Sequence, residues 1–191
     1  MSGRSTETTD SELTTAAWLA SRSQGPFPAG SVFLHAPSSA FQAPGGGENQ
    51  LVQTGRCLEA LDVPIRLFSG WTDRIRHARA LHLFGMSREG LELARIARSQ
   101  RVPVVVSPIC WYEPRALWAL EPTLRRRLAA TAGWSIRRAA PVTPSWRRTL
   151  LHLADRILPN SIAEADQLSR LFGVDRARFT VVPNGVSPAF G

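Results

Sequence analysis

The stretch Val102-Pro-Val-Val-Val-Ser107 is a nearly continuous run of β-branched residues. Such a run is typical of a strand that is buried on both faces, as strands in parallel sheets are. Shorter apolar runs on either side of it predict further strands at residues 31–35, 64–68, 80–84, 156–159 and 178–182. Amphipathic segments between them predict helices at residues 48–61, 87–101 and 161–172. This alternation predicts a Rossmann-like α/β fold, a parallel sheet with helices on both faces.

The composition is that of a soluble protein and excludes several kinds of catalytic and binding site. The chain has 191 residues with 23 basic and 15 acidic side chains, and every basic one is Arg. Without Lys, neither a P-loop lysine nor a Schiff base with a carbonyl substrate is available. The longest apolar stretch is interrupted by proline and is too short to span a bilayer. We therefore expect a cytoplasmic chain with a poorly ordered tail at residues 1–29 and one folded domain at residues 30–182.

Open parallel sheets bind ligands beyond the carboxyl ends of their strands, so the loops there are the first candidates. The loop after the first strand holds Gly45, Gly46 and Gly47, followed by Glu48, directly before a predicted helix. Glycines at a helix N-terminus let backbone N–H groups approach an anion. The alternative is a flexible turn that feeds the helix.

The histidines and cysteines carry weaker signals. His35 and His82 fall at predicted strand ends, where each either faces a ligand or is a structural histidine. The four histidines show no spacing of metal ligands, so no metal site is expected. Cys57 and Cys110 are expected to be unpaired thiols of a reducing compartment.

The C-terminal region combines a strand, a capped helix and a sharp turn. Residues 155–161 lead from a strand into a helix whose start, with Ser161 followed three residues later by Glu164, fits a capping box. After that helix a second strand runs into a turn at Asn184 and Gly185, a pair that readily adopts positive φ.

The order of these pieces resembles the N-terminal half of GT-B glycosyltransferases, specifically the retaining enzymes of family 4. In that family, a glycine-rich loop follows the first strand and a later strand ends in His-x-x-Gly. An Asp-Arg-x-x-x-x-Ser segment then precedes a helix, and a Val-x-Pro-Asn-Gly-Val turn ends the domain. The matching stretches here are residues 46–48, 82–85, 155–161 and 181–186, and the resemblance covers residues 31–190.

The resemblance implies a transferase that moves a sugar from a nucleotide-sugar to an acceptor, lipid-linked or part of a polysaccharide, in a cleft between two domains. The first domain would hold mainly the acceptor, and no cofactor beyond the donor is expected. The donor- or acceptor-binding residues that the resemblance points to are Gly45, Gly46, Gly47, Glu48, His82, Ser161, Asn184 and Gly185. Many relatives carry a His just after the fourth strand, but residues 107–113 hold none, so the catalytic residues stay unassigned.

The resemblance also sets an expectation about organisation. Residues 183–191 are expected to begin an interdomain linker, with the donor-binding domain absent, and we expect no transfer by this chain alone. Two alternatives stay open: half of a nucleotide-sugar epimerase, which shares the architecture, and a non-enzymatic module that binds a membrane or a partner.

An Arg-rich segment, residues 115–148, holds eight Arg and three Trp against one acidic residue. A helix that starts near Pro122 has a period of about 3.6 residues, which aligns Leu124, Leu128, Ala132 and Ile136 on one side. The other side carries the membrane-surface candidates Arg126, Arg127, Trp134, Arg137 and Arg138.

A basic face with an interfacial aromatic suits an anionic membrane and predicts a peripheral protein at the inner membrane face. The alternative is a solvated Arg face whose Trp packs against the domain. Nucleic-acid binding is disfavoured because the segment contains no recognised reader motif.

Overall fold

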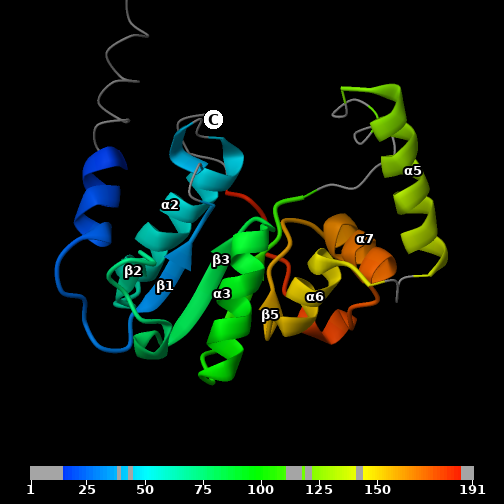
Figure 1. The fold of residues 1–191 in the computed structure, drawn as a ribbon. Coiled ribbons are helices and arrows are strands. Elements are labelled where there is room, and N and C mark those ends of the chain that lie inside the picture. Colours follow the sequence, from blue (N-terminus) through cyan, green and yellow to red (C-terminus); the bar gives the residue numbers. More distant parts are fainter. Residues whose placement is uncertain are drawn as a thin grey trace, which may run out of the picture.

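The structure is a computed structural model that describes residues 15–37, 40–42, 45–110, 118, 122–140 and 144–185. A parallel five-stranded sheet with the strand order β2-β1-β3-β4-β5 forms its centre (Figure 1). The strands are β1 (Val32–His35), β2 (Ile65–Leu67), β3 (Ala80–Phe84), β4 (Val104–Ser107) and β5 (Arg156–Ile157). The predicted Rossmann-like α/β fold is therefore confirmed.

Helices cover both faces of the sheet. The labelled helices are α2 (Gly46–Ala60), α3 (Arg88–Ser99), α5 (Leu124–Ala139), α6 (Trp146–Leu153) and α7 (Ile162–Phe172). Successive strand side chains point to opposite faces, so Leu34 packs in the core under α2 while the neighbouring Phe33 packs in the core under α3 and α6. The last two helices lie side by side (Figure 1). Of these five labelled helices, α6 has no counterpart among the predicted helices.

The sixth predicted strand, at residues 178–182, is replaced by a single bridge between Ile157 and Phe179. The backbone still follows β5, because the Val182 N–H donates to the Pro159 carbonyl at 2.9 Å. Proline has no N–H with which to return a bond. The ladder therefore stops after the two residues of β5.

Residues 15–23, which the sequence assigns to a poorly ordered tail, form a helix docked on α2. Trp18 covers Gly55, and its Nε1–H donates to the Glu59 carboxylate at 2.9 Å. Arg22 pairs with the same carboxylate. The docking is possible because α2 has a glycine at the one position where the indole ring lies. Residues 1–14 of the predicted tail lie outside the described residues.

Candidate functional site at the carboxyl edge of the sheet

The register of the sheet brings the strand ends level with one another. His35 at the end of β1 lies opposite Leu83, and Phe84 at the end of β3 lies opposite Ser107. The loops that follow β1, β2, β3, β4 and β5 therefore leave the sheet on one edge, where ligands of this fold class bind.

The glycine run forms the start of α2 at this edge. Gly45 is the N-cap residue, and its N–H donates to the Glu48 carboxylate at 2.8 Å. Gly46 has open space where a side chain would begin, whereas Gly47 lies against Ile109 of the loop after β4. Glu48 thus has a structural partner, and the backbone of Gly45 and Gly46 is the exposed part of this loop.

A buried carboxylate joins the loops after β4 and β5. Glu164 is 4% exposed, and its two oxygens accept from the Cys110 N–H at 3.0 Å and from the Asn160 N–H at 2.7 Å. The predicted capping box is present in a modified form: Ser161 Oγ accepts from the Glu164 N–H at 3.1 Å, while the carboxylate bonds to Asn160. Ser161 is therefore occupied in capping α7.

Gln50 connects α2 to the same loop. Its Nε2 donates to Asn160 Oδ1 at 2.9 Å, across 110 positions of sequence. Among the residues that the structure describes, two buried side-chain polar atoms have no hydrogen-bond partner, Oε1 of Gln50 and Nε2 of His35. Both belong to this edge of the sheet, one on α2 and one at the end of β1.

His82 is placed differently from the other candidates. It is 6% exposed, its Nε2 lies 2.9 Å from Ser107 Oγ, and its ring stacks on Phe84 with centroids 4.2 Å apart. Burial lowers the pKa of His82 to about 4, so the imidazole is neutral at physiological pH. Its geometry is that of a structural histidine, the alternative left open by the sequence.

His35 has an unpaired ring nitrogen and a carboxylate close by. It is 7% exposed, and its Nε2 lies 3.8 Å from Oε1 of Glu89 in the first turn of α3. Burial lowers the pKa of His35, and the opposing influence of Glu89 is the smaller of the two. The imidazole is therefore neutral, and its Nε2 is buried without a hydrogen-bond partner among the described residues.

Asn184 and Gly185 continue past the end of β5. The Val182 bond to Pro159 carries the chain beyond the carboxyl end of that strand, and both residues are exposed. Neither of the two has the positive φ expected from the sequence, and the described backbone forms no turn there. The structure thus gathers the glycine run, Ser161 and the Asn-Gly pair at one edge, together with His35. Reasoning from the sequence missed Gln50 and Asn160 as site residues, and it named Glu164 only as part of a cap.

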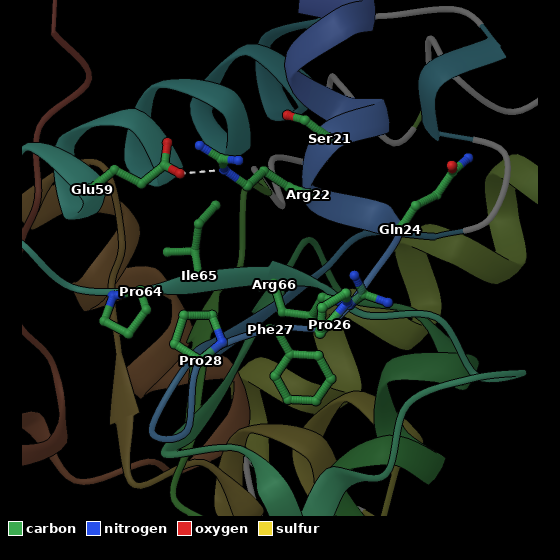
Figure 2. Close-up of a pocket in the computed structure, with 10 residues that line it drawn as sticks. All are labelled: Ser21, Arg22, Gln24, Pro26, Phe27, Pro28, Glu59, Pro64, Ile65 and Arg66. Atoms are coloured by element: carbon green, nitrogen blue, oxygen red, sulfur yellow. Dashed lines mark hydrogen bonds and ion pairs between the residues drawn. The ribbon is translucent and has the colours of Figure 1, made fainter.

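A cavity of ≈ 280 Å³ lies elsewhere, between the helix of residues 15–23 and β2 (Figure 2). Pro28 precedes β1 and Pro64 precedes β2, so the cavity opens at the amino ends of these strands, opposite the candidate site. Figure 2 shows Arg22 and Glu59 paired across part of it. Its wall also holds Arg66, which donates to Gly25 O at 3.2 Å. The cavity therefore lies at the interface between the N-terminal helix and the sheet.

The helix α5 stands at one side of the molecule, next to α7 (Figure 1). Its apolar residues face outward: Leu124 is 63% exposed, Leu128 56% and Ile136 55%. Trp134 instead packs against the main core, beneath the guanidinium of Arg138 at 5.5 Å from the ring centre. The predicted helix is confirmed, but its apolar side points away from the domain. Trp134, a predicted membrane-surface residue, packs on the domain instead, as in the alternative of a solvated Arg face. The side chain of Arg137 lies outside the described residues.

The described residues contain no group of three His, Cys, Asp or Glu side chains arranged to hold a metal ion. Within the same ranges, no helix combines the length and the apolar character that crossing a bilayer requires.

A Rossmann-like domain with polar strand-end loops places this chain in the class of open α/β folds, whose ligands bind at the carboxyl edge of the sheet. A comparison with protein families gives this class a name. The family model of Glycosyltransferase Family 4 matches residues 44–190, a span that begins at the glycine run and includes every strand-end loop after it. The chain belongs to this family and carries a glycosyltransferase domain. No curated protein matches the sequence at a significant level.

Proposed function

We propose that this chain is the acceptor-side domain of an enzyme that transfers a sugar from a nucleotide-sugar to an acceptor held at the carboxyl edge. The observation that carries the proposal is the position of the two unpartnered buried atoms, Nε2 of His35 and Oε1 of Gln50. Leaving a buried polar atom unpaired costs roughly 1–3 kcal/mol. Hydroxyl groups of a bound sugar would supply the missing partners at the edge where this fold class binds ligands.

The exposed glycines give the donor a place to approach. The backbone of Gly46 opens on solvent at the N-terminus of α2, where the helix dipole favours an anion, while the N–H of Gly45 is already bonded to Glu48. We assign this position to the diphosphate of the nucleotide-sugar, with most of the nucleotide held by a second domain. Stabilising charge on a departing phosphate is the chemistry that such donors supply.

The test adds a side chain at Gly46, which the fold can accommodate but which would block a ligand from the backbone. Gly46→Leu places atoms in open space, so stability should be kept while the approach to the backbone is blocked. Gly70→Leu is the matched control, because Gly70 also has open space and lies outside α2. Backbone NMR of the chain with uridine and guanosine diphosphate-sugars should show saturable shifts at residues 45–47 that Gly46→Leu removes and Gly70→Leu keeps. Shifts confined to the cavity of Figure 2, or no shifts with any donor, would refute the assignment.

We further propose that α5 holds the domain on an anionic membrane, where a lipid-linked acceptor would be found. Residues 124–139 contain five Arg and no acidic residue, and the outward side carries Leu124, Leu128 and Ile136. An apolar stripe flanked by Arg is the pattern of a helix that lies in the plane of a membrane interface. Anionic lipid complements the charge, and the three apolar side chains would enter the acyl region.

Vesicle flotation tests the membrane proposal. The chain should float with phosphatidylglycerol vesicles, float less as salt rises, and stay in solution with phosphatidylcholine alone. Leu128→Glu combined with Ile136→Glu should abolish flotation. Ile162→Glu, which changes an equally exposed apolar residue on α7, should not. Absence from anionic vesicles at every salt concentration would end the proposal, as would flotation that the double variant leaves unchanged.

A further inference from the structure

The ends of β1 and β2 and the start of α3 form a corner with a histidine, an aromatic ring and a carboxylate, of which the proposed function uses only the histidine. His35 ends β1, Phe68 follows β2, and Glu89 lies in the first turn of α3. The three come from separate elements and meet at the carboxyl edge: Phe68 lies edge-on to the His35 ring at 6.1 Å, and Glu89 lies 3.8 Å from Nε2 of His35.

The spacing of the two polar groups fits one intervening oxygen atom. At 3.8 Å, the imidazole nitrogen and the carboxylate oxygen are too far apart to bond each other. An oxygen at about 2.8 Å from both completes a hydrogen-bonded bridge. A hydroxyl suits that position when Nε2 carries the proton of the neutral imidazole, since it then accepts from the Nε2–H and donates its one hydrogen to the carboxylate.

The surroundings select the kind of molecule that carries this hydroxyl. The Glu89 carboxylate repels phosphates and carboxylates, which argues against an anionic group at this corner. The aromatic ring of Phe68 offers an apolar surface to the C–H face of a sugar ring. The same loop carries Trp71, whose side chain is 94% exposed. Glu89 is half exposed, so the corner is open to solvent on its side.

We propose that His35 and Glu89 bind one hydroxyl group of a neutral sugar, and that this corner is the subsite for the sugar unit of the acceptor. The assignment rests on the proposed acceptor-side function and adds the chemical class of the acceptor group. His35 supplies a buried, oriented nitrogen, while Glu89 supplies a carboxylate that the ligand can approach from solvent.

The probe for the experiment is a panel of methyl glycosides of neutral hexoses. Side-chain NMR of the imidazoles follows Nε2 of His35, with the exposed His77 as an internal reference. A binding glycoside should shift the His35 signal saturably and leave that of His77 unchanged. Inorganic phosphate, added separately, should not shift it.

Variants keep the test independent of folding. Glu89→Gln should weaken glycoside affinity at least fivefold without loss of thermal stability, because the side chain is half exposed. Glu92→Gln, one turn further along α3 and more exposed, is the matched control and should leave the affinity unchanged. His35→Gln should remove the shift and identify the signal.

The proposal is overturned by the absence of a saturable shift with every glycoside, by an equal response to phosphate, or by equal losses in Glu89→Gln and Glu92→Gln. These outcomes are separable from failure of the proposed function. If nucleotide-sugars shift residues 45–47 while glycosides leave His35 unmoved, the transferase assignment stands and this subsite falls.

Discussion

Replacing Gly55 by Ala should destabilise the chain when Trp18 is present and stabilise it when Trp18 is replaced by Ala. A Cβ at Gly55 would lie 2.5 Å from Cη2 of Trp18 and 2.7 Å from Cζ2, with Cδ1 of Ile65 at 3.3 Å. Carbon atoms pack best at about 3.5–4.0 Å. The indole ring must therefore move away, and its bond to Glu59 must break.

The magnitude follows from two opposing contributions. Overpacking a tight contact costs about 1–3 kcal/mol. The cost cannot exceed the free energy of detaching the helix of residues 15–23 from α2, because that helix then undocks. Removing Gly from a helix interior gains about 1 kcal/mol. With the overpacking cost taken at about 2 kcal/mol, Gly55→Ala should lower the free energy of unfolding by about 1 kcal/mol. In a Trp18→Ala chain the methyl group has room, so the same change should raise the free energy of unfolding by about 1 kcal/mol.

Urea unfolding of the four chains, followed by far-UV circular dichroism, measures this double-mutant cycle. The coupling between the two positions should be about 2 kcal/mol. Gly46→Ala serves as the control, because a Cβ added at Gly46 would have no atom within 4 Å, and its effect should be the same with or without Trp18. An effect of Gly55→Ala with the same sign and size in both backgrounds would refute the packing argument.

Three further changes test the buried polar groups. Asp73→Asn should cost about 3 kcal/mol by unpairing the buried Arg66 guanidinium. Although burial opposes it, hydrogen bonding from Arg66 and neighbouring groups lowers the pKa of Asp73, so the wild type should lose stability as pH falls below about 4 and the variant should lack that loss. His82 binds its proton more weakly when folded, with a pKa of about 4, so stability should fall by roughly 3 kcal/mol between pH 6.5 and 4, a slope that His82→Gln removes. Glu164→Gln turns an amide group toward a backbone donor and should cost about 2 kcal/mol. It should also speed hydrogen exchange at the Cys110 N–H, which mass spectrometry detects. Unchanged exchange at Cys110, or unchanged pH dependence of stability in the other two variants, would contradict these assignments.

Local patterns were sufficient to predict the sheet and most of its helices. The β-branched run that became β4 and the apolar run that became β3 are buried on both faces, so the sequence carries a continuous apolar signal there. By contrast, α6 spans eight residues, little more than two turns, and its periodicity is too short to separate from its surroundings. The strand expected at residues 178–182 lost its ladder because of a proline in its neighbour.

The orientation of α5 shows a different limit. The helical period correctly sorted Leu128 and Ile136 from Arg126 and Trp134, yet it could not determine which side packs on the domain. The side with Trp134 does so, because the indole ring reaches the main core. Leu128 and Ile136 are exposed to solvent, whereas hydrophobicity alone would predict that they are buried.

The candidate site was predictable only where a motif is local. The glycine run and the Asn-Gly pair follow directly from strand-end rules and lie at the expected edge, although the positive φ expected of the pair is not adopted. The Gln50–Asn160 bond joins residues 110 positions apart, so only the packing of α2 beside the β5 loop reveals it. His82 shows the converse: a strand-end position predicted a ligand contact, but its side chain turns into the interior and bonds Ser107.

The carboxylate of Glu164 has a mechanical consequence for any closing motion. It fastens the loop after β4 and the loop after β5 to the start of α7, and Gln50 ties α2 to the same place. The described start of the loop after β4, the loop after β5 and the start of α2 are therefore linked to one another through side chains. A ligand or an opposing domain that presses on one of them moves all three, so the conformational entropy of ordering these segments is spent during folding and not at the moment of binding.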